Sequence, residues 1–244
     1  MRAAFVRLCW ENQARTIASL YFKPDKAYHF TAGQYADITI PHDAPDRRGL
    51  TRTMTFSSNS SNQLLGFTTR LSTKSSSTYK QALLRLKPND PVTITDSMGD
   101  MVLPLDSSMP LVFVAGGLGI ASYVSMISWL TEQQDARDIT LLYAVSNTSD
   151  IIFQEQFDAY SSVGRFTKVL YTTDHKAGGI SWAGEIVKSR ITAADIIARA
   201  KPDAQIYLSG TESMVEQLRH DLQQKYAVPQ YRIAFDFFEG YTEL

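Results

Sequence analysis

Cysteine is almost absent from this sequence, since Cys9 is the only one. A single thiol excludes a disulfide framework within the chain and a cysteine-ligated iron–sulfur cluster. Four histidines are scattered along the chain without the spacing of zinc ligands, so no metal site is predicted. They are His29, His42, His175 and His220.

Neither sign of charge is in excess, because 24 Lys and Arg residues stand against 25 Asp and Glu residues. This balance argues against a general nucleic-acid binder, although it leaves room for a local basic patch. Long apolar runs are also missing. The longest, 111–129, contains three glycines and is more typical of a buried strand, a loop and a helix than of a membrane span. The first residues lack the apolar stretch of a signal peptide. We therefore expect a cytoplasmic protein with no membrane or nucleic-acid partner.

The first half of the chain is typical of a small antiparallel β-barrel. Short segments rich in Thr, Val, Ile and aromatic residues alternate with turn signals such as Lys23-Pro24-Asp25. One helix is predicted over 77–86, because apolar residues recur there at spacings of three and four. The predicted strands cover residues 3–11, 15–22, 35–40, 52–58, 64–71, 91–96 and 101–103.

The second half alternates strands and helices, which predicts a parallel sheet covered on both faces. A polar turn at 106–110 separates the halves, so the predicted domains are 1–108 and 109–244. The predicted strands cover residues 111–115, 140–145, 166–172, 205–209 and 231–237, and the helices cover 121–133, 151–160, 193–200 and 212–226.

A glycine loop follows the first predicted parallel strand. The segment Gly116-Gly117-Leu118-Gly119 leads from that strand into a helix, where free backbone N–H groups and the helix dipole favour a phosphate. The alternative is that these glycines only permit tight strand–helix packing. The loop departs from the Rossmann fingerprint, because it has no third glycine in the expected place and no clear ribose-binding acid ends the next strand.

Several motifs together resemble the ferredoxin–NADP reductase superfamily of flavoproteins, in the family's order and over almost the whole chain. The motifs are Gly33-Gln34-Tyr35, 52–58, Asp96-Ser97-Met98-Gly99, 115–120, 209–214 and 237–241. The resemblance implies a two-domain fold, with an antiparallel flavin-binding β-barrel that contains one helix, followed by an α/β NAD(P)-binding domain with a parallel sheet.

The resemblance places flavin contacts on the segment that begins at Arg52. Arg52 would hold the flavin phosphates, since its planar guanidinium matches phosphate oxygens. Thr55 would hydrogen bond near flavin N5, with Thr53 beside it. Met54 departs from the family, which usually has Tyr at this position, so the phenol contact to the flavin is lost. The alternatives are that Arg52 is an ordinary surface arginine and that Thr55 is an ordinary strand threonine.

Hydroxyl residues precede the one helix of the barrel. The resemblance implies that Ser76, Ser77 and Thr78 face the flavin pyrophosphate at this helix N-terminus. The family glycine is missing here, and simple capping of the helix is the alternative.

In the second domain the resemblance assigns nucleotide contacts to the glycine loop and to a second loop. Gly116, Gly117, Gly119 and Ile120 would contact the pyrophosphate. Ser209 stands where the family has a cysteine beside the nicotinamide, and Gly210 follows it.

Two further residues complete the predicted site. Tyr241 would stack on the flavin, and Glu239 is a candidate proton relay near it. Asp174, after the third parallel strand, would repel a 2′-phosphate and bond ribose hydroxyls instead, which favours NADH. The predicted catalytic residues are Thr55, Ser209 and Tyr241.

The resemblance implies an oxidoreductase that passes electrons from NADH or NADPH through FAD to a separate acceptor, with no fused iron–sulfur domain. The acceptor would be a ferredoxin, a flavodoxin, another redox protein or a small oxidant. FAD is favoured over FMN because Arg52 and the helix after Ser77 suit a pyrophosphate. One alternative is a flavin or ferric-chelate reductase with weakly bound flavin. Another is a nucleotide-binding regulatory or electron-transfer subunit without turnover of its own.

Overall fold

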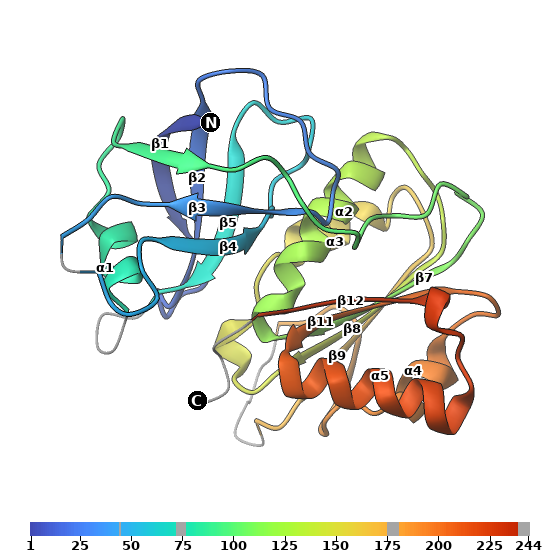
Figure 1. The fold of residues 1–244 in the computed structure, drawn as a ribbon. Helices are drawn as coiled ribbons and strands as arrows, with labels where there is room; N and C mark the ends of the chain where they lie inside the picture. Colours follow the sequence, from blue (N-terminus) through green and yellow to red (C-terminus); the bar gives the residue numbers. More distant parts are fainter. Residues whose placement is uncertain (44, 72–76, 175–180, 239–244) are drawn as a thin grey trace.

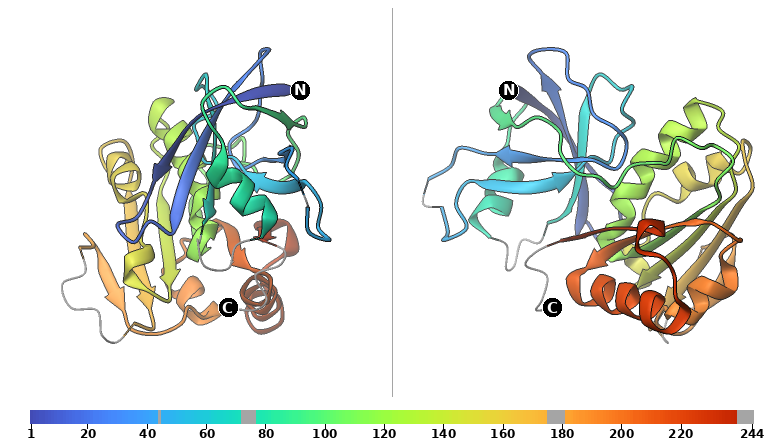
Figure 2. Two further views of the ribbon diagram at one scale, coloured as in Figure 1. Left: turned by 90° about the vertical axis from the view of Figure 1, so that its left-hand side faces the viewer. Right: turned by 45° about the vertical axis from the view of Figure 1, so that its right-hand side comes forward.

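The computed structural model describes residues 1–43, 45–71, 77–174 and 181–238. The chain forms two sheet-based parts, and Figure 1 shows the first to the left and the second to the right. The right-hand view in Figure 2 shows the same two parts side by side. The predicted fold class, an antiparallel barrel with one helix followed by a parallel α/β domain, is confirmed.

The first sheet has six antiparallel strands in the order β4-β3-β6-β1-β2-β5. Phe56, just after β4, forms a bridge with Phe67 of β5, so the two edges of the sheet meet and the barrel closes. Both phenylalanines are fully buried in the barrel core. The strands are β1 (Arg2–Trp10), β2 (Ile17–Pro24), β3 (Tyr35–Thr39), β4 (Thr51–Thr55), β5 (Leu65–Arg70) and β6 (Pro91–Ile94).

The one α-helix of the first part, α1 (Thr78–Arg85), begins at a side-chain cap. The Ser77 Oγ accepts a hydrogen bond from the Lys80 N–H, which satisfies one of the free donors of the first turn. Tyr79, Ala82 and Leu83 are buried against the barrel core. The spacing that predicted this helix is therefore the spacing of its buried face.

The second sheet has six parallel strands in the order β10-β9-β8-β7-β11-β12. Its central strands are continuous apolar runs because both faces are covered; every residue from Leu111 to Ala115 is buried. The strands are β7 (Leu111–Gly116), β8 (Ile139–Val145), β9 (Phe166–Thr172), β10 (Glu185–Val187), β11 (Gln205–Thr211) and β12 (Ile233–Phe238).

Helices cover both faces of this sheet (Figure 1). The helix α2 (Ile120–Glu132) is buried on almost all sides because it lies between the sheet and the barrel. It packs with α3 (Gln154–Tyr160) on one face, and α4 (Ala193–Arg199) and α5 (Glu212–Tyr226) cover the other face. Short 3-10 turns lie at η1 (Gly117–Gly119), η2 (Thr148–Asp150) and η3 (Gln230–Arg232).

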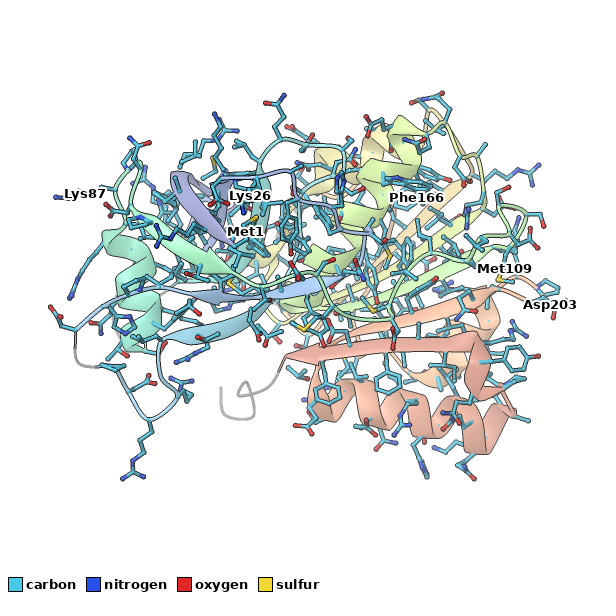
Figure 3. The ribbon with its side chains drawn as sticks, turned by 45° about the horizontal axis from the view of Figure 1, so that its top comes forward. Met1, Lys26, Lys87, Met109, Phe166 and Asp203 are labelled. Carbon is cyan, nitrogen blue, oxygen red and sulfur yellow. The ribbon has the colours of Figure 1, made fainter. Side chains whose placement is uncertain are left out.

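The carboxyl ends of the parallel strands point toward the barrel. Met109, just before β7, and Asp203, just before β11, lie at the end of the molecule away from Met1 and Lys87 of the first part (Figure 3). Loops that follow β7 and β11 therefore meet the first part. Ligands of open α/β sheets bind at this edge.

Polar contacts fix the two parts together. Arg70 at the end of β5 pairs with Asp150 in η2, with N and O atoms 2.8 Å apart. The Ser125 Oγ on α2 donates to the Ser58 carbonyl oxygen at 2.7 Å. Asn12 donates to the Ser149 carbonyl oxygen at 3.1 Å. Two of these three contacts involve largely buried groups, so the junction is held more firmly than surface ion pairs alone would hold it.

Several element predictions were wrong in detail. The segment 101–103 is not a strand: the Val102 carbonyl accepts a hydrogen bond from the Tyr207 hydroxyl instead of a neighbouring strand. The helix predicted from 151 begins at Gln154, because Phe153 adopts a left-handed φ of 62°. The strand β10 was missed because it is short and exposed and gives no apolar period.

The predicted division between residues 108 and 109 stays a prediction; it lies between the end of β6 and the start of β7. Each α-helix in the described ranges is too short or too polar to cross a lipid bilayer.

Candidate functional site

The glycine loop after β7 lies where the strand order of the second sheet changes direction. From β7 the chain continues to β8, β9 and β10 on one side and later to β11 and β12 on the other. The end of β11, with Ser209 and Gly210, runs beside the end of β7. Such a change of direction is the ligand site of open α/β sheets.

Two glycines at this point permit the close approach of the strand ends. A Cβ on Gly119 would lie 2.2 Å from the Ser209 carbonyl oxygen, and one on Gly210 would lie 3.1 Å from the Gly116 Cα. Gly117 differs, because its φ is 52° and nothing lies within 4 Å of a Cβ placed on it. The loop therefore has a packing role at Gly119 and an open position at Gly117, and phosphate binding by the loop stays a prediction.

Free hydrogen-bonding groups gather at the same edge. The turn η1 runs directly into α2, and the Ile120 N–H donates to the Gly117 carbonyl oxygen, so the helical N-terminus that lacks a side-chain cap is the glycine loop itself, at Gly116. The hydroxyls of Ser122 and Ser209 are fully buried and have no hydrogen-bond partner among the residues that the structure describes. Buried hydroxyls normally find partners, so a bound ligand or water is expected here. Ile120, by contrast, is fully buried in the core, and its side chain is directed away from solvent.

The barrel meets this edge through Thr55. The Thr55 Oγ1 donates a hydrogen bond to the Asp236 carboxylate on β12 at 3.3 Å. Asp236 pairs in register with Ser209 on β11. Two of the predicted catalytic residues, one from each domain, therefore lie on either side of Asp236, a residue that the sequence analysis missed.

Burial raises the pKa of Asp236 above its ordinary value, and the hydrogen bond from Thr55 partly opposes this. A raised pKa in the folded state means that the folded protein binds the proton more tightly than the unfolded chain does. This contribution to stability is therefore complete below the ordinary pKa of 3.8 and is lost as pH rises through the folded pKa.

Asp236→Asn removes the titrating group but keeps an acceptor for Thr55. We therefore expect the stability of the variant relative to the native protein to increase between about pH 3.5 and about pH 7. Urea unfolding of both proteins across this range measures the difference in their free energies of unfolding. The other carboxylates contribute equally to both proteins, so their effects cancel in this difference. A difference that stays constant with pH would contradict the assignment.

The side chain of Arg52, on β4, is held by the loop that precedes this strand. Its guanidinium donates to the carbonyl oxygens of Gly49 at 3.2 Å and Arg48 at 2.8 Å and lies 3.2 Å from the Asp46 carboxylate. It also lies over the ring of Tyr79, 5.0 Å from the centroid. The charge is therefore preorganised beside α1, and a bound phosphate would compete with Asp46 for it.

The other predicted flavin contacts take different places. Thr53 is exposed and donates to Asp37 at 2.5 Å. Met54 is only 8% exposed and packs in the barrel core. Ser77 caps α1, and the Thr78 Oγ1 accepts a hydrogen bond from the Asp46 N–H at 2.9 Å. The capping alternative for Ser77 thus describes its contact in this structure.

Asp174 lies at the end of β9 and accepts a hydrogen bond from the Thr148 Oγ1 at 3.2 Å. Thr148 follows β8, so this contact joins the carboxyl ends of two neighbouring strands. Ser76, Glu239 and Tyr241 lie outside the described residues.

Comparison with known proteins agrees with this geometry. The model of the oxidoreductase NAD-binding domain family matches residues 113–220. A ferredoxin NADP+ reductase from Neisseria gonorrhoeae, solved with bound FAD and NADP, superposes with a TM-score of 0.75 at 18% identity, covering 97% of this chain and 98% of that chain. The chain therefore has the two-domain fold of that reductase.

Curated proteins that match this chain include reductase components of oxygenases. The reductase component of propane 2-monooxygenase from Rhodococcus jostii (strain RHA1) is 25% identical over 239 residues, or 93% of this chain and 61% of that protein. The reductase component of phenol 2-monooxygenase from Pseudomonas sp. (strain CF600) is 32% identical over 149 residues, or 59% of this chain and 39% of that protein. The chain thus spans less than two thirds of the length of these relatives.

Proposed function

We propose that this chain takes a hydride from NADH or NADPH onto bound FAD and passes the electrons to a separate acceptor. The observation that carries the proposal is the Thr55–Asp236 contact, because it brings the predicted flavin strand of the barrel to the glycine edge of the parallel sheet. The reductase-type fold and the named reductase relatives support the same activity.

The residues present suit FAD. Arg52 would bind the pyrophosphate through its guanidinium fork, in place of Asp46, and the N–H groups at the start of α1 lie beside it. Thr55 would hydrogen bond the flavin ring in place of Asp236. When bound, FAD accepts hydride and releases its electrons one at a time. The chain itself supplies position and charge.

The nicotinamide nucleotide would occupy the edge formed by β7 and β11. The N–H groups of the glycine loop in η1 would bind its pyrophosphate, and the open position at Gly117 leaves room for it. The unpartnered Ser209 hydroxyl would hydrogen bond near the nicotinamide ring. The orphaned Ser209 hydroxyl thus acquires a partner.

The acceptor is proposed by class. Both curated relatives are reductase components, so a separate oxygenase or ferredoxin-like protein is the favoured recipient of the electrons. The flavin or ferric-chelate reductase alternative predicts that FAD is lost on dialysis. The regulatory-subunit alternative predicts bound FAD with no NAD(P)H-dependent dye reduction. Dialysis followed by a dye-reduction assay therefore separates all three functions.

Asp174 is expected to set the preference for NADH. Its carboxylate stands near where a 2′-phosphate would lie and would repel that dianion. In Asp174→Asn, which keeps an acceptor for Thr148, we expect the ratio of NADPH to NADH turnover (kcat/KM) to rise about tenfold, equivalent to about 1.4 kcal/mol.

The matched control is Asp203→Asn, which removes a carboxylate that is 94% exposed at the opposite edge of the sheet. This control is expected to leave the ratio unchanged. An equal ratio in Asp174→Asn and the native protein would show that Asp174 does not act on the coenzyme.

A further inference from the structure

Three hydroxyl groups form a continuous row on the outer face of the barrel. The Ser19 Oγ lies 2.7 Å from the Thr68 Oγ1, which lies 2.7 Å from the Ser57 Oγ. These residues come from β2, from β5 and from the segment after β4, so the row crosses three neighbouring segments. Ser19 is 1% exposed and Thr68 is 6% exposed, which shields the middle of the row from bulk water.

The row joins a surface carboxyl group to the proposed flavin strand. Glu11, which is partly exposed, continues the pairing of β1 with β2, because its N–H donates to the Ile17 carbonyl oxygen at 2.8 Å, and its side chain therefore lies beside Ser19 on the outer face. At the other end, Ser57 lies two residues after Thr55. Phe56 between them is buried in the barrel core, so Thr55 and Ser57 both face outward.

The second domain covers this outer face. Ile17, two residues before the β2 member of the row, packs in the core cluster of the second domain. Arg70, two residues after the β5 member, pairs with Asp150. The Ser58 carbonyl oxygen accepts a hydrogen bond from Ser125 of α2. Bulk water therefore has limited access to this face, and the hydroxyl row offers a fixed chain of hydrogen bonds in place of water molecules.

Each hydroxyl has one proton, so the row runs in one direction at a time. When Thr68 donates to Ser57, Ser19 donates to Thr68, and only a protonated Glu11 completes the row by donating to Ser19. When Glu11 is ionised, it accepts from Ser19, and every bond in the row is reversed. Moving one proton from Ser57 to Glu11 thus needs only short transfers between neighbouring oxygens.

The proposed reaction leaves one proton to remove in each turnover. The nicotinamide delivers two electrons and one proton together as hydride, whereas a one-electron acceptor takes the two electrons only. The remaining proton must leave the flavin for solvent. We propose that the hydroxyl row and Glu11 carry this proton from the flavin site to the surface. This inference rests on the proposed function.

The surroundings of Glu11 suit a proton acceptor. Burial raises the pKa of the Glu11 carboxyl, and the hydrogen bond with Ser19 partly opposes this. Burial also raises the pKa of Tyr21 nearby; the charge of Glu11 adds to that effect, and Arg7 and a hydrogen bond with Ser19 oppose it. From the second domain, Asp150 contacts Asn12, next to Glu11 in the chain, and is paired with Arg70.

The row is tested first in the protein without flavin, by NMR. Across the titration of the Glu11 carboxyl carbon, the Thr68 methyl resonance is expected to shift with the same midpoint, because hydrogen bonds in a chain polarise one another. In Ser19→Ala that shift is expected to disappear, whereas a through-space effect of the charge would persist. The row is overturned if the Thr68 methyl resonance does not shift during the titration of Glu11, or if the same shift persists in Ser19→Ala.

Proton release is then measured with a pH-indicator dye while an acceptor oxidises the NADH-reduced, FAD-loaded protein. Thr68→Val is expected to slow release at least about tenfold with the flavin midpoint potential unchanged. Thr69→Val, a neighbour that is 7% exposed and faces inward, is the matched control and is expected to behave as the native protein does. Equal release rates in Thr68→Val and the native protein overturn the inference. Failure of NADH to reduce the flavin would instead overturn the proposed function, while the NMR result on the row would stand.

Discussion

Gly119→Ala is expected to destabilise the protein by about 3 kcal/mol, at the upper end of overpacking effects. The added Cβ would lie 2.2 Å from the Ser209 carbonyl oxygen and 2.8 Å from the Gly210 nitrogen. Both are backbone atoms of β11, which cannot move aside as a flexible side chain can. The turn η1 and the end of β11 must therefore separate, which opens the proposed nucleotide edge. Urea unfolding measures the loss.

Gly117→Ala is the control for this prediction. A Cβ there meets nothing within 4 Å, so only the positive φ of 52° is unfavourable, at about 1 kcal/mol. We expect this variant to fold but to bind NADH more weakly, because its methyl group enters the open position. Equal stability of the two variants would contradict the close approach of η1 to β11.

Arg52→Ala is expected to weaken FAD binding about 100-fold, equivalent to about 2.7 kcal/mol, the scale of a charge-assisted contact to phosphate. Arg52 is the arginine that lies over Tyr79 and beside α1, with its side chain 21% exposed. Titration of the apoprotein with FAD, followed by flavin fluorescence, measures the effect.

The matched control is Arg48→Ala. Arg48 pairs with the same Asp46 but its side chain is 61% exposed. This variant is expected to bind FAD within about twofold of the native protein. Comparable losses in both variants would mean that general loop charge, rather than the position of Arg52, holds the flavin. A circular dichroism spectrum guards against unfolding in either variant.

The contiguous features of this molecule could be predicted from sequence. The glycine loop is one run of residues, and the buried strand β7 before it is a continuous apolar run, so the local pattern is enough to place both. The same holds for α1, whose buried face has helical spacing. Met54 shows the limit, since its strand was predicted but its burial in the barrel core depends on how the barrel closes.

Contacts between distant segments could not be predicted. Thr55 and Asp236 are 181 positions apart, and nothing in either local pattern links them. An acid within the aromatic strand β12 was the only local signal for Asp236, because a charged residue among Phe235 and Phe237 needs a partner. The hydroxyl row is similar, because Ser19 and Thr68 lie 49 positions apart and meet only through the pairing of β2 with β5.

The most direct test of the account is an absorption spectrum of the FAD-loaded protein, recorded without oxygen before and after addition of NADH and then, in a second sample, of NADPH. We predict flavin bands that bleach with both nucleotides, faster with NADH. A protein that holds no flavin after incubation with FAD or FMN, or bound flavin that neither nucleotide bleaches, would contradict the proposed electron transfer and leave only the fold.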